Sequence, residues 1–222
     1  ERALREGLVV DWMIRKGMLK SKFGIQSNIR KTTVMHQANK FSVDKYKSEK
    51  VATIALQIYD QTYNILHNDD NKRGRNLLCA ACFLYNSGKQ INLTAYHKHS
   101  WYLIKNCELL GYSLSEKNII AAIVRYHRKS LPKKRHESWQ NLISREDKST
   151  ALDMSLILRL AAAINKRPDP VISSVNIKLS NKEIKFKLLS SDKGKNLILE
   201  KWSLESCYEV IKELKDLELK VV

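Results

Sequence analysis

The spacing of apolar residues predicts a chain that is mostly helical and then changes to strands. Through the first three quarters of the sequence, apolar side chains recur every three or four residues, which is the pattern of a helix with one buried face. The expected helices cover about 4–13, 29–38, 45–67, 74–85, 102–110, 115–131 and 147–167. The last of these is the richest in Ala and Leu, and Pro168 and Pro170 end it because proline cannot continue a helix.

Beyond Pro170 the hydrophobic period becomes two, as in a strand with one buried face. Apolar residues alternate with polar ones over 175–179 and again over 184–188. A short helix over about 204–214 and a last strand over 217–221 would complete a ββαβ unit. The fold is therefore expected to be mainly α, with a helical bundle followed by a small C-terminal ββαβ unit.

The composition supports a folded, helix-rich protein. With 222 residues, of which 43% are hydrophobic, the chain can bury a core for one large or two unequal domains. Glycine (7) and proline (3) are scarce, which favours helices over loop-rich β structure. No apolar stretch approaches the ~20 residues that cross a bilayer, and no signal peptide is recognisable.

The four cysteines are expected to be reduced. Cys79 and Cys82 have a C-x-x-C spacing, which can be half of a zinc site or a redox pair. They lie within an apolar helical run over 77–84, without a second C-x-x-C, and this context favours thiols buried in a core. Reduced thiols are typical of the cytoplasm, which is the expected location.

Positive charge is concentrated in one part of the chain. The formal net charge is +17, and residues 89–135 carry ten Lys/Arg against two Glu. Such a cluster repels itself unless an anion lies beside it, and a chain of phosphates is a natural partner. Nucleic acid, inorganic polyphosphate, a phosphorylated nucleotide and an anionic membrane surface all fit the charge alone.

This basic segment supplies candidate phosphate-binding residues. Arg125, Arg128 and Lys129 share one face if a helix continues through them, because they lie three and four positions apart. His97 and His99 do not share a helix face, but both could turn toward a phosphate from a loop or a helix start. A run of charges is usually a solvated surface, whereas the crowding of cations here favours phosphate binding. The candidates in this segment are His97, Lys98, His99, Arg125, His127, Arg128, Lys129, Lys133, Lys134 and Arg135.

Three motifs in register resemble the Ppx/GppA family of exopolyphosphatases and guanosine pentaphosphate phosphatases. They are RALREGL at 2–8 followed by Asp11, YHKHS at 96–100, and VRYHRK at 124–129. The resemblance covers about residues 2–167 and is weaker beyond them. It implies an active site in two N-terminal actin-like domains, and nothing in this sequence resembles their phosphate loops or catalytic carboxylate.

The resemblance also implies a domain organisation. Residues 1–26 would be a helix and linker from the missing actin-like catalytic half, 27–167 an HD-like helical domain, and 171–222 a small α/β domain. The chain starts without Met and already in helical periodicity, which suits a piece of a longer polypeptide. Relatives form dimers through these helical domains, so a homodimer is implied, together with contact to the protein's own actin-like domains.

HD hydrolases bind a divalent metal through His and Asp side chains. By register with them, the first His falls at Lys47, the His-Asp pair at Tyr85 and Asn86, and the last Asp at Ala162. An ammonium or a methyl group cannot ligate a metal, so no metal site is expected in this chain. Lys47 can fill the place of the ion with its own charge, which adds it to the phosphate-binding candidates, or it can extend to solvent.

The implied function is a hypothesis with two rivals. This part of the protein would hold a polyphosphate chain while its end is hydrolysed in the missing half, where Mg²⁺ is expected; alone it would be inactive and without a cofactor. One rival is an autonomous HD-type metal-dependent phosphohydrolase, and the other is a non-catalytic module that binds nucleic acid or (p)ppGpp. The resemblance does not separate inorganic polyphosphate from guanosine pentaphosphate (pppGpp), since both present phosphate chains.

Overall fold

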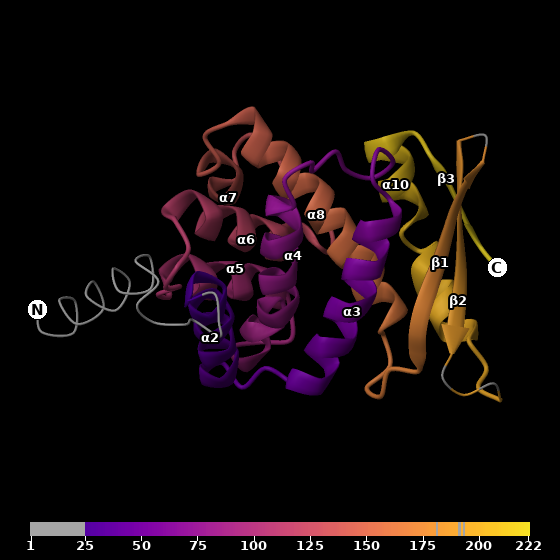
Figure 1. Ribbon diagram of the computed structural model, residues 1–222, viewed down its shortest axis with the longest axis horizontal. Coiled ribbons are helices and arrows are strands. Elements are labelled where there is room, and N and C mark those ends of the chain that lie inside the picture. The colour runs from indigo at the N-terminus through magenta and orange to yellow at the C-terminus, as the bar shows by residue number, and fades with distance from the viewer. Residues whose placement is uncertain (1–24, 181, 191, 193) are drawn as a thin grey trace, which may run out of the picture.

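The computed structural model describes residues 25–222 except 181, 191 and 193, so the helix expected over 4–13 lies outside the described residues. Its helices are α2 (Ile25–Lys40), α3 (Lys45–Gln61), α4 (Arg73–Leu84), the 3₁₀ helix η1 (Ser87–Gln90), α5 (Tyr96–Asn106), α6 (Leu114–Tyr126), α7 (Glu137–Gln140), α8 (Arg145–Ile164), α9 (Ile198–Glu205) and α10 (Tyr208–Lys215). The strands are β1 (Ile172–Ser180), β2 (Glu183–Ser190) and β3 (Glu218–Val221). A mainly α fold with a small C-terminal sheet unit is thereby confirmed. In Figure 1, α3 and α8 lie between the remaining helices of the bundle and the sheet.

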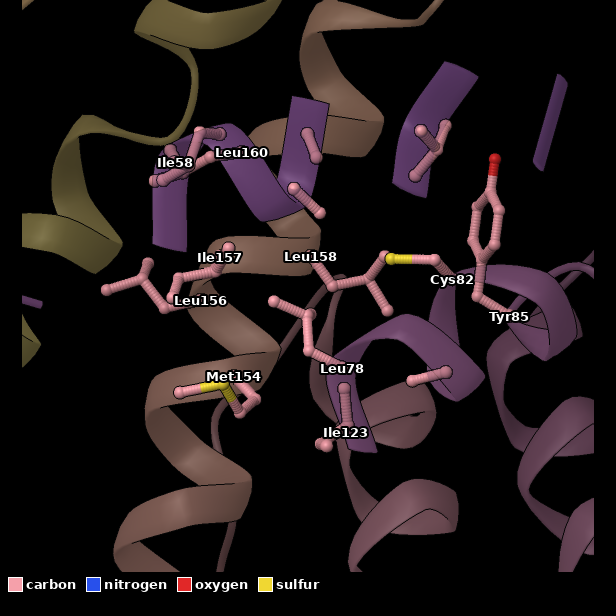
Figure 2. Close-up of a cluster of buried hydrophobic side chains, with 14 of the residues drawn as sticks. Ile58, Leu78, Cys82, Tyr85, Ile123, Met154, Leu156, Ile157, Leu158 and Leu160 are labelled. Atoms are coloured by element: carbon pink, nitrogen blue, oxygen red, sulfur yellow. The ribbon is translucent and has the colours of Figure 1, made fainter. Parts of the chain in front are cut away.

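Helix α8 is the central helix of the bundle, with α3, α4 and α6 packed against it. Leu158 of α8, Leu78 of α4 and Ile123 of α6 are fully buried in one cluster (Figure 2). Burying an aliphatic side chain of this size contributes about 1.5–3 kcal/mol, so this contact region is a principal source of stability. None of the described helices is both long and apolar enough to cross a membrane.

The cysteines of the described residues are free thiols. Cys82 is buried in the same core cluster as Leu158 (Figure 2), and burial raises its pKa. The prediction of a reduced core thiol is confirmed for Cys82. Cys79 and Cys107 are only half-buried, and Cys207, also buried, lies near the C-terminal helices.

Several helix boundaries differ from those expected, and the end of α3 is one of them. Helix α3 begins as predicted, because the Asp44 side chain accepts a hydrogen bond from the Lys47 N–H (3.0 Å). It ends at Gln61 instead of continuing to about residue 67, because Thr62 and the left-handed Asn64 (φ 59°) turn the chain. Local backbone geometry therefore overrides an apolar pattern that runs on into the following turn.

Helix α6 begins at Leu114, one residue before the expected start. Ser113 is its N-cap: the Ser113 hydroxyl accepts from the Glu116 N–H, and the Glu116 carboxylate accepts from the Ser113 N–H, which is a capping box. Ser115, the expected start, instead donates its hydroxyl hydrogen to Asp147 at the beginning of α8 (2.8 Å).

Helix α5 begins at Tyr96 and ends at Asn106, six and four residues earlier than expected. The YHKHS motif is therefore its first turns and not a loop before it. Ser100 fixes this position, since its hydroxyl donates to the Tyr85 carbonyl and accepts from the Gly88 N–H. A Cβ at position 88 would lie 2.2 Å from the Tyr96 carbonyl oxygen, so glycine is needed for η1 to approach α5.

The sheet has the order β1-β2-β3, with β1 and β2 antiparallel and β2 and β3 parallel. Helix α3 covers the outer edge of β1: the Gln57 side chain accepts from the Val175 N–H, and Gln61 bonds both the Val175 carbonyl and the Ile177 N–H. These bonds attach the sheet to the bundle through backbone groups that an edge strand would otherwise expose.

The prediction of a single helix over 204–214 is wrong, because two helices, α9 and α10, occupy this region. The chain bends between them at Ser206 and Cys207. Helix α9 was missed because two of its apolar residues do not face the core. Ile198 and Trp202 are 69% and 64% exposed, so the apolar spacing does not mark the buried face of this helix.

Candidate phosphate-binding site

A pocket of about 380 Å³ lies between the helical bundle and the C-terminal α9–α10 segment. The bundle lines it with residues of α3, η1, α5, α8 and the turns that follow α4 and α6, and the C-terminal segment adds Ser203, Ser206 and Cys207. All four positions that the HD register assigns to metal ligands line this one pocket, as that register predicts: they are Lys47, Tyr85, Asn86 and Ala162.

Six cationic side chains line the pocket, and no Asp or Glu is among its described lining residues. We refer to the following six as the cationic pocket: Lys47, Lys89, Arg128, Lys129, Arg159 and Lys166. Three of them, Lys47, Arg128 and Lys129, were predicted from the sequence. The other three were not among the candidates.

Partial charges orient three of the pocket cations, Lys47, Arg128 and Lys89. The Lys47 ammonium donates to the Arg167 carbonyl (2.9 Å). The guanidinium of Arg128 lies over the Tyr96 ring at 4.7 Å from its centre, and the Lys89 ammonium lies 5.1 Å from the same centre. Carbonyl oxygens and an aromatic face orient a cation without neutralising it.

Several other cations of the described chain have carboxylate partners. Arg75 pairs with Asp60, and Arg167 pairs with the buried Glu200. In contrast, none of the six pocket cations lies within salt-bridge distance of a described carboxylate. The pocket therefore retains a net positive charge, which the nearby Asp44 offsets only in part.

The pocket cations are close enough for the charge of one to shift the pKa of another. Burial lowers the pKa of Lys89, and the charges of Lys47, Arg128 and Lys166 lower it further. Burial also lowers the pKa of Lys47; Asp44 acts in the opposite direction, and Lys166 again lowers it. A bound anion would relieve this repulsion, whereas a metal cation would add to it.

The turn after α6 brings Arg128 and Lys129 to the pocket. Helix α6 ends at Tyr126, and Lys129 has a left-handed backbone (φ 60°), so the predicted common helix face with Arg125 is wrong. One Arg159 nitrogen, Nη2, donates to the carbonyls of Tyr126 and Lys129, both at 2.9 Å. Arg159 thus fixes the turn by satisfying carbonyls at the helix end, while Arg125 stays outside the pocket.

His127 lines the pocket but is buried, and both of its ring nitrogens have partners within the protein. Its Nδ1 lies 2.6 Å from the Val124 carbonyl, which only an N–H can satisfy, and its Nε2 lies 3.2 Å from the Tyr96 hydroxyl. Burial lowers the His127 pKa to about 3, so the ring is neutral at ordinary pH. Its place in the site is structural support for Tyr96.

The remaining candidates do not line the pocket. Lys98, Arg125, Lys133 and Arg135 lie around His136, whose pKa is lowered by burial first and then by the charges of all four. We refer to these four residues as the outer basic cluster. Two of the candidate histidines lie elsewhere: His97 is buried, with a pKa lowered to about 4 by burial and nearby cations, and His99 is half-buried. Lys134 is exposed.

Two of the missed residues had a recognisable signal. Arg159 and Lys166 lie seven positions apart, and Ala162 and Ala163 fall between them on the same face of α8 and its continuation. Because Ala162 already marked a lost metal ligand, its neighbours at three and four positions were the ones to consider. Lys89 lay in the basic segment but outside its two densest motifs.

The residues present do not fit the divalent metal that HD hydrolases use. Lys47 and Ala162 cannot ligate an ion, and Asn86 offers only a neutral amide. Within the part of the chain that the structure describes, no group of three or more His, Cys, Asp or Glu side chains could hold a metal ion.

Comparisons with known proteins identify the family of the chain. The model for "Ppx/GppA phosphatase, domain III" matches residues 29–207, a range that contains every lining residue of the pocket. A guanosine-5'-triphosphate,3'-diphosphate pyrophosphatase of Pseudoalteromonas translucida (strain TAC 125) is 33% identical over 139 residues. The match covers 59% of this chain and 28% of that protein's length. Since the family match extends over most of its length, the chain belongs to the Ppx/GppA phosphatase family.

Proposed function

We propose that the cationic pocket binds a chain of phosphates and holds it for hydrolysis by actin-like catalytic domains of the same protein. The ligand chemistry is a phosphoanhydride chain, from either inorganic polyphosphate or pppGpp. The observation that carries the proposal is the convergence of six cations in a pocket whose described lining has no carboxylate; carbonyl oxygens or an aromatic face orient four of them.

The geometry supports phosphate over other anions because the cations surround a concave space. Arg128 offers a planar donor pair, and Lys47 and Lys166 are mobile point charges, a combination that suits tetrahedral phosphoryl groups. The outer basic cluster would extend the path for a long polymer beyond the pocket. Binding through several weak contacts would then increase with chain length and fall steeply with salt.

The test is a comparison of two triple variants by isothermal titration calorimetry with inorganic polyphosphate. In the first, Lys47→Gln, Arg128→Gln and Lys166→Gln neutralise the pocket; in the control, Lys40→Gln, Lys178→Gln and Lys187→Gln remove three exposed charges elsewhere. We expect the pocket variant to bind about tenfold more weakly or worse, since tenfold corresponds to only about 1.4 kcal/mol shared by three lost phosphate contacts. The control should change affinity much less.

Equal affinities of the two triple variants at moderate salt would contradict the proposal. Titration of wild-type protein with polyphosphate, pppGpp and single-stranded RNA at matched ionic strength separates the possible ligands. Preference for RNA would favour a nucleic-acid module. Phosphatase activity of this chain alone that a chelator abolishes would instead favour an autonomous HD hydrolase.

The wider organisation belongs to the same proposal. The actin-like half would supply the catalytic groups and Mg²⁺, this chain would contribute no bond-breaking residue or cofactor, and the protein would act in the cytoplasm as a homodimer. Sedimentation analysis of the chain measures the dimer directly. Polyphosphate hydrolysis by the chain alone would contradict the division of labour.

A further inference from the structure

Tyr96 connects two pocket cations to the interior of the bundle. It is the first residue of α5, and its side chain lines the pocket. The Arg128 guanidinium lies 4.7 Å from the ring centre and the Lys89 ammonium 5.1 Å from it. Both distances are within the range of a cation–π interaction, which is about 6 Å.

The Tyr96 ring is itself fixed by a neutral histidine. Because His127 Nδ1–H donates to the Val124 carbonyl, its Nε2 carries no hydrogen and accepts from the Tyr96 hydroxyl. His127 also packs edge-on against Tyr85, with ring centres 5.3 Å apart. The hydroxyl of Tyr96 is therefore bonded inside the bundle, where the Arg128 guanidinium also lies close enough to act on it, and the face of the ring is left for the two cations.

We propose that Tyr96, held by His127, is a positioning residue that pre-organises Arg128 and Lys89 for phosphate binding. The inference rests on the proposed function, which it deepens by assigning a role to a residue that carries no charge. Tyr96 acts through the two cations and need not touch the phosphate. This role differs from that of a pocket wall, because it depends on the electron-rich face of the ring and not on its volume alone.

Repulsion within the pocket explains why such a residue is needed. Lys89 lies near Lys47, Arg128 and Lys166, and their charges act against its own. Without an attractive surface, Lys89 and Arg128 would extend into solvent and would have to return to the pocket when a ligand binds, at a cost in side-chain entropy. The negative face of Tyr96 holds them near the pocket while leaving their charge available.

The test uses substitutions that separate the ring face from its volume. Tyr96→Leu removes the face, Tyr96→Phe keeps it, and pentafluorophenylalanine at position 96 keeps the ring's shape but reverses its electrostatic face. With inorganic tripolyphosphate as the probe, we expect the Leu and pentafluoro variants to bind about five- to tenfold more weakly, in line with cation–π strengths at partly desolvated sites. The Phe variant should retain most of the affinity.

A double-mutant cycle with Arg128→Ala shows whether Tyr96 acts through the cation. If it does, Tyr96→Leu will have a clearly smaller effect in the Arg128→Ala background than in the wild type. Tyr102→Leu, at an exposed position of the same helix, is the control and should leave affinity unchanged. Additive effects in the cycle would overturn the inference.

The pentafluoro substitution keeps the test decisive even if the Leu variant does not fold, because its volume is close to that of phenylalanine. Equal binding of the Phe and pentafluoro variants would overturn the role of the ring face. This outcome is distinct from failure of the proposed function, in which wild-type protein would not bind tripolyphosphate at all.

Discussion

Individual side chains decide what the pocket can bind. At two positions that the resemblance aligns with metal ligands of HD hydrolases, the pocket of this chain has the ammonium of Lys47 and the methyl group of Ala162. An ammonium that bonds only a carbonyl still attracts phosphate oxygens. Under the proposed function, these side chains would favour an anion over a metal ion at this position.

The buried histidines make stability depend on pH. Burial lowers the pKa of His127 to about 3 and that of His97 to about 4, from 6.5 when unfolded. Between these values and 6.5 the unfolded chain binds more protons, so the stabilising contribution is complete above pH 6.5 and is lost as the pH falls toward 4 and then 3. We expect the free energy of unfolding of His97→Gln/His127→Gln protein to decline less between about pH 7 and 4 than that of wild type.

Chemical denaturation at a series of pH values measures this difference in slope. His36→Gln is the matched control, because His36 is exposed on α2, and its slope should equal that of wild type. Parallel pH profiles for the wild type and the double variant would contradict the neutral, buried state of the two histidines.

Among the helices, α6 shows how a short sequence signal sets a boundary that hydrophobic spacing misses. The apolar pattern placed its start near Ser115, but the capping box of Ser113 and Glu116 begins it earlier. Its C-terminal end was also misplaced, because Arg159 from another helix binds the last carbonyls and lets the chain turn at Lys129. The first error was avoidable from sequence; the second depends on a contact between residues 30 positions apart.

The cap makes a prediction about stability. Ser113→Ala removes the acceptor for the Glu116 N–H, and loss of a helix N-cap costs about 1 kcal/mol. Ser149→Ala, at an exposed position in the interior of α8, should be neutral or slightly stabilising because alanine is the better helix former. Urea denaturation of the two variants measures the difference, and equal stabilities would show that the capping box does not hold the start of α6.

The sequence predicted the mainly α fold and the later sheet because their periodicities differ. It also predicted which positions would form the pocket, through the register of Lys47, Tyr85, Asn86 and Ala162. It did not separate pocket residues from the outer basic cluster, because both groups lie in the same basic segment and only the end of α6 divides them. Lys166 was missed although it lies four positions after Ala162, because the concentration of positive charge favoured the basic segment before α8.

At the scale of the whole molecule, the pocket lies where the helical bundle meets the C-terminal α9–α10 segment. Lys47 comes from the bundle and bonds the Arg167 carbonyl, while the Arg167 guanidinium pairs with Glu200 of α9 (2.5 Å). The linker after α8 is thus tied to both sides of the pocket. A ligand that occupies this junction contacts residues far apart in sequence, so phosphate binding would also hold the C-terminal helices against the bundle.

The most direct test of the cationic pocket is a crystal structure of the chain with inorganic tripolyphosphate. The account predicts phosphate oxygens within hydrogen-bond distance, about 3 Å, of Lys47, Arg128 and Lys166, with no metal ion at that position. Two results would contradict it: phosphate bound only at the outer basic cluster, or a metal ion bound in the pocket beside Lys47 and Ala162.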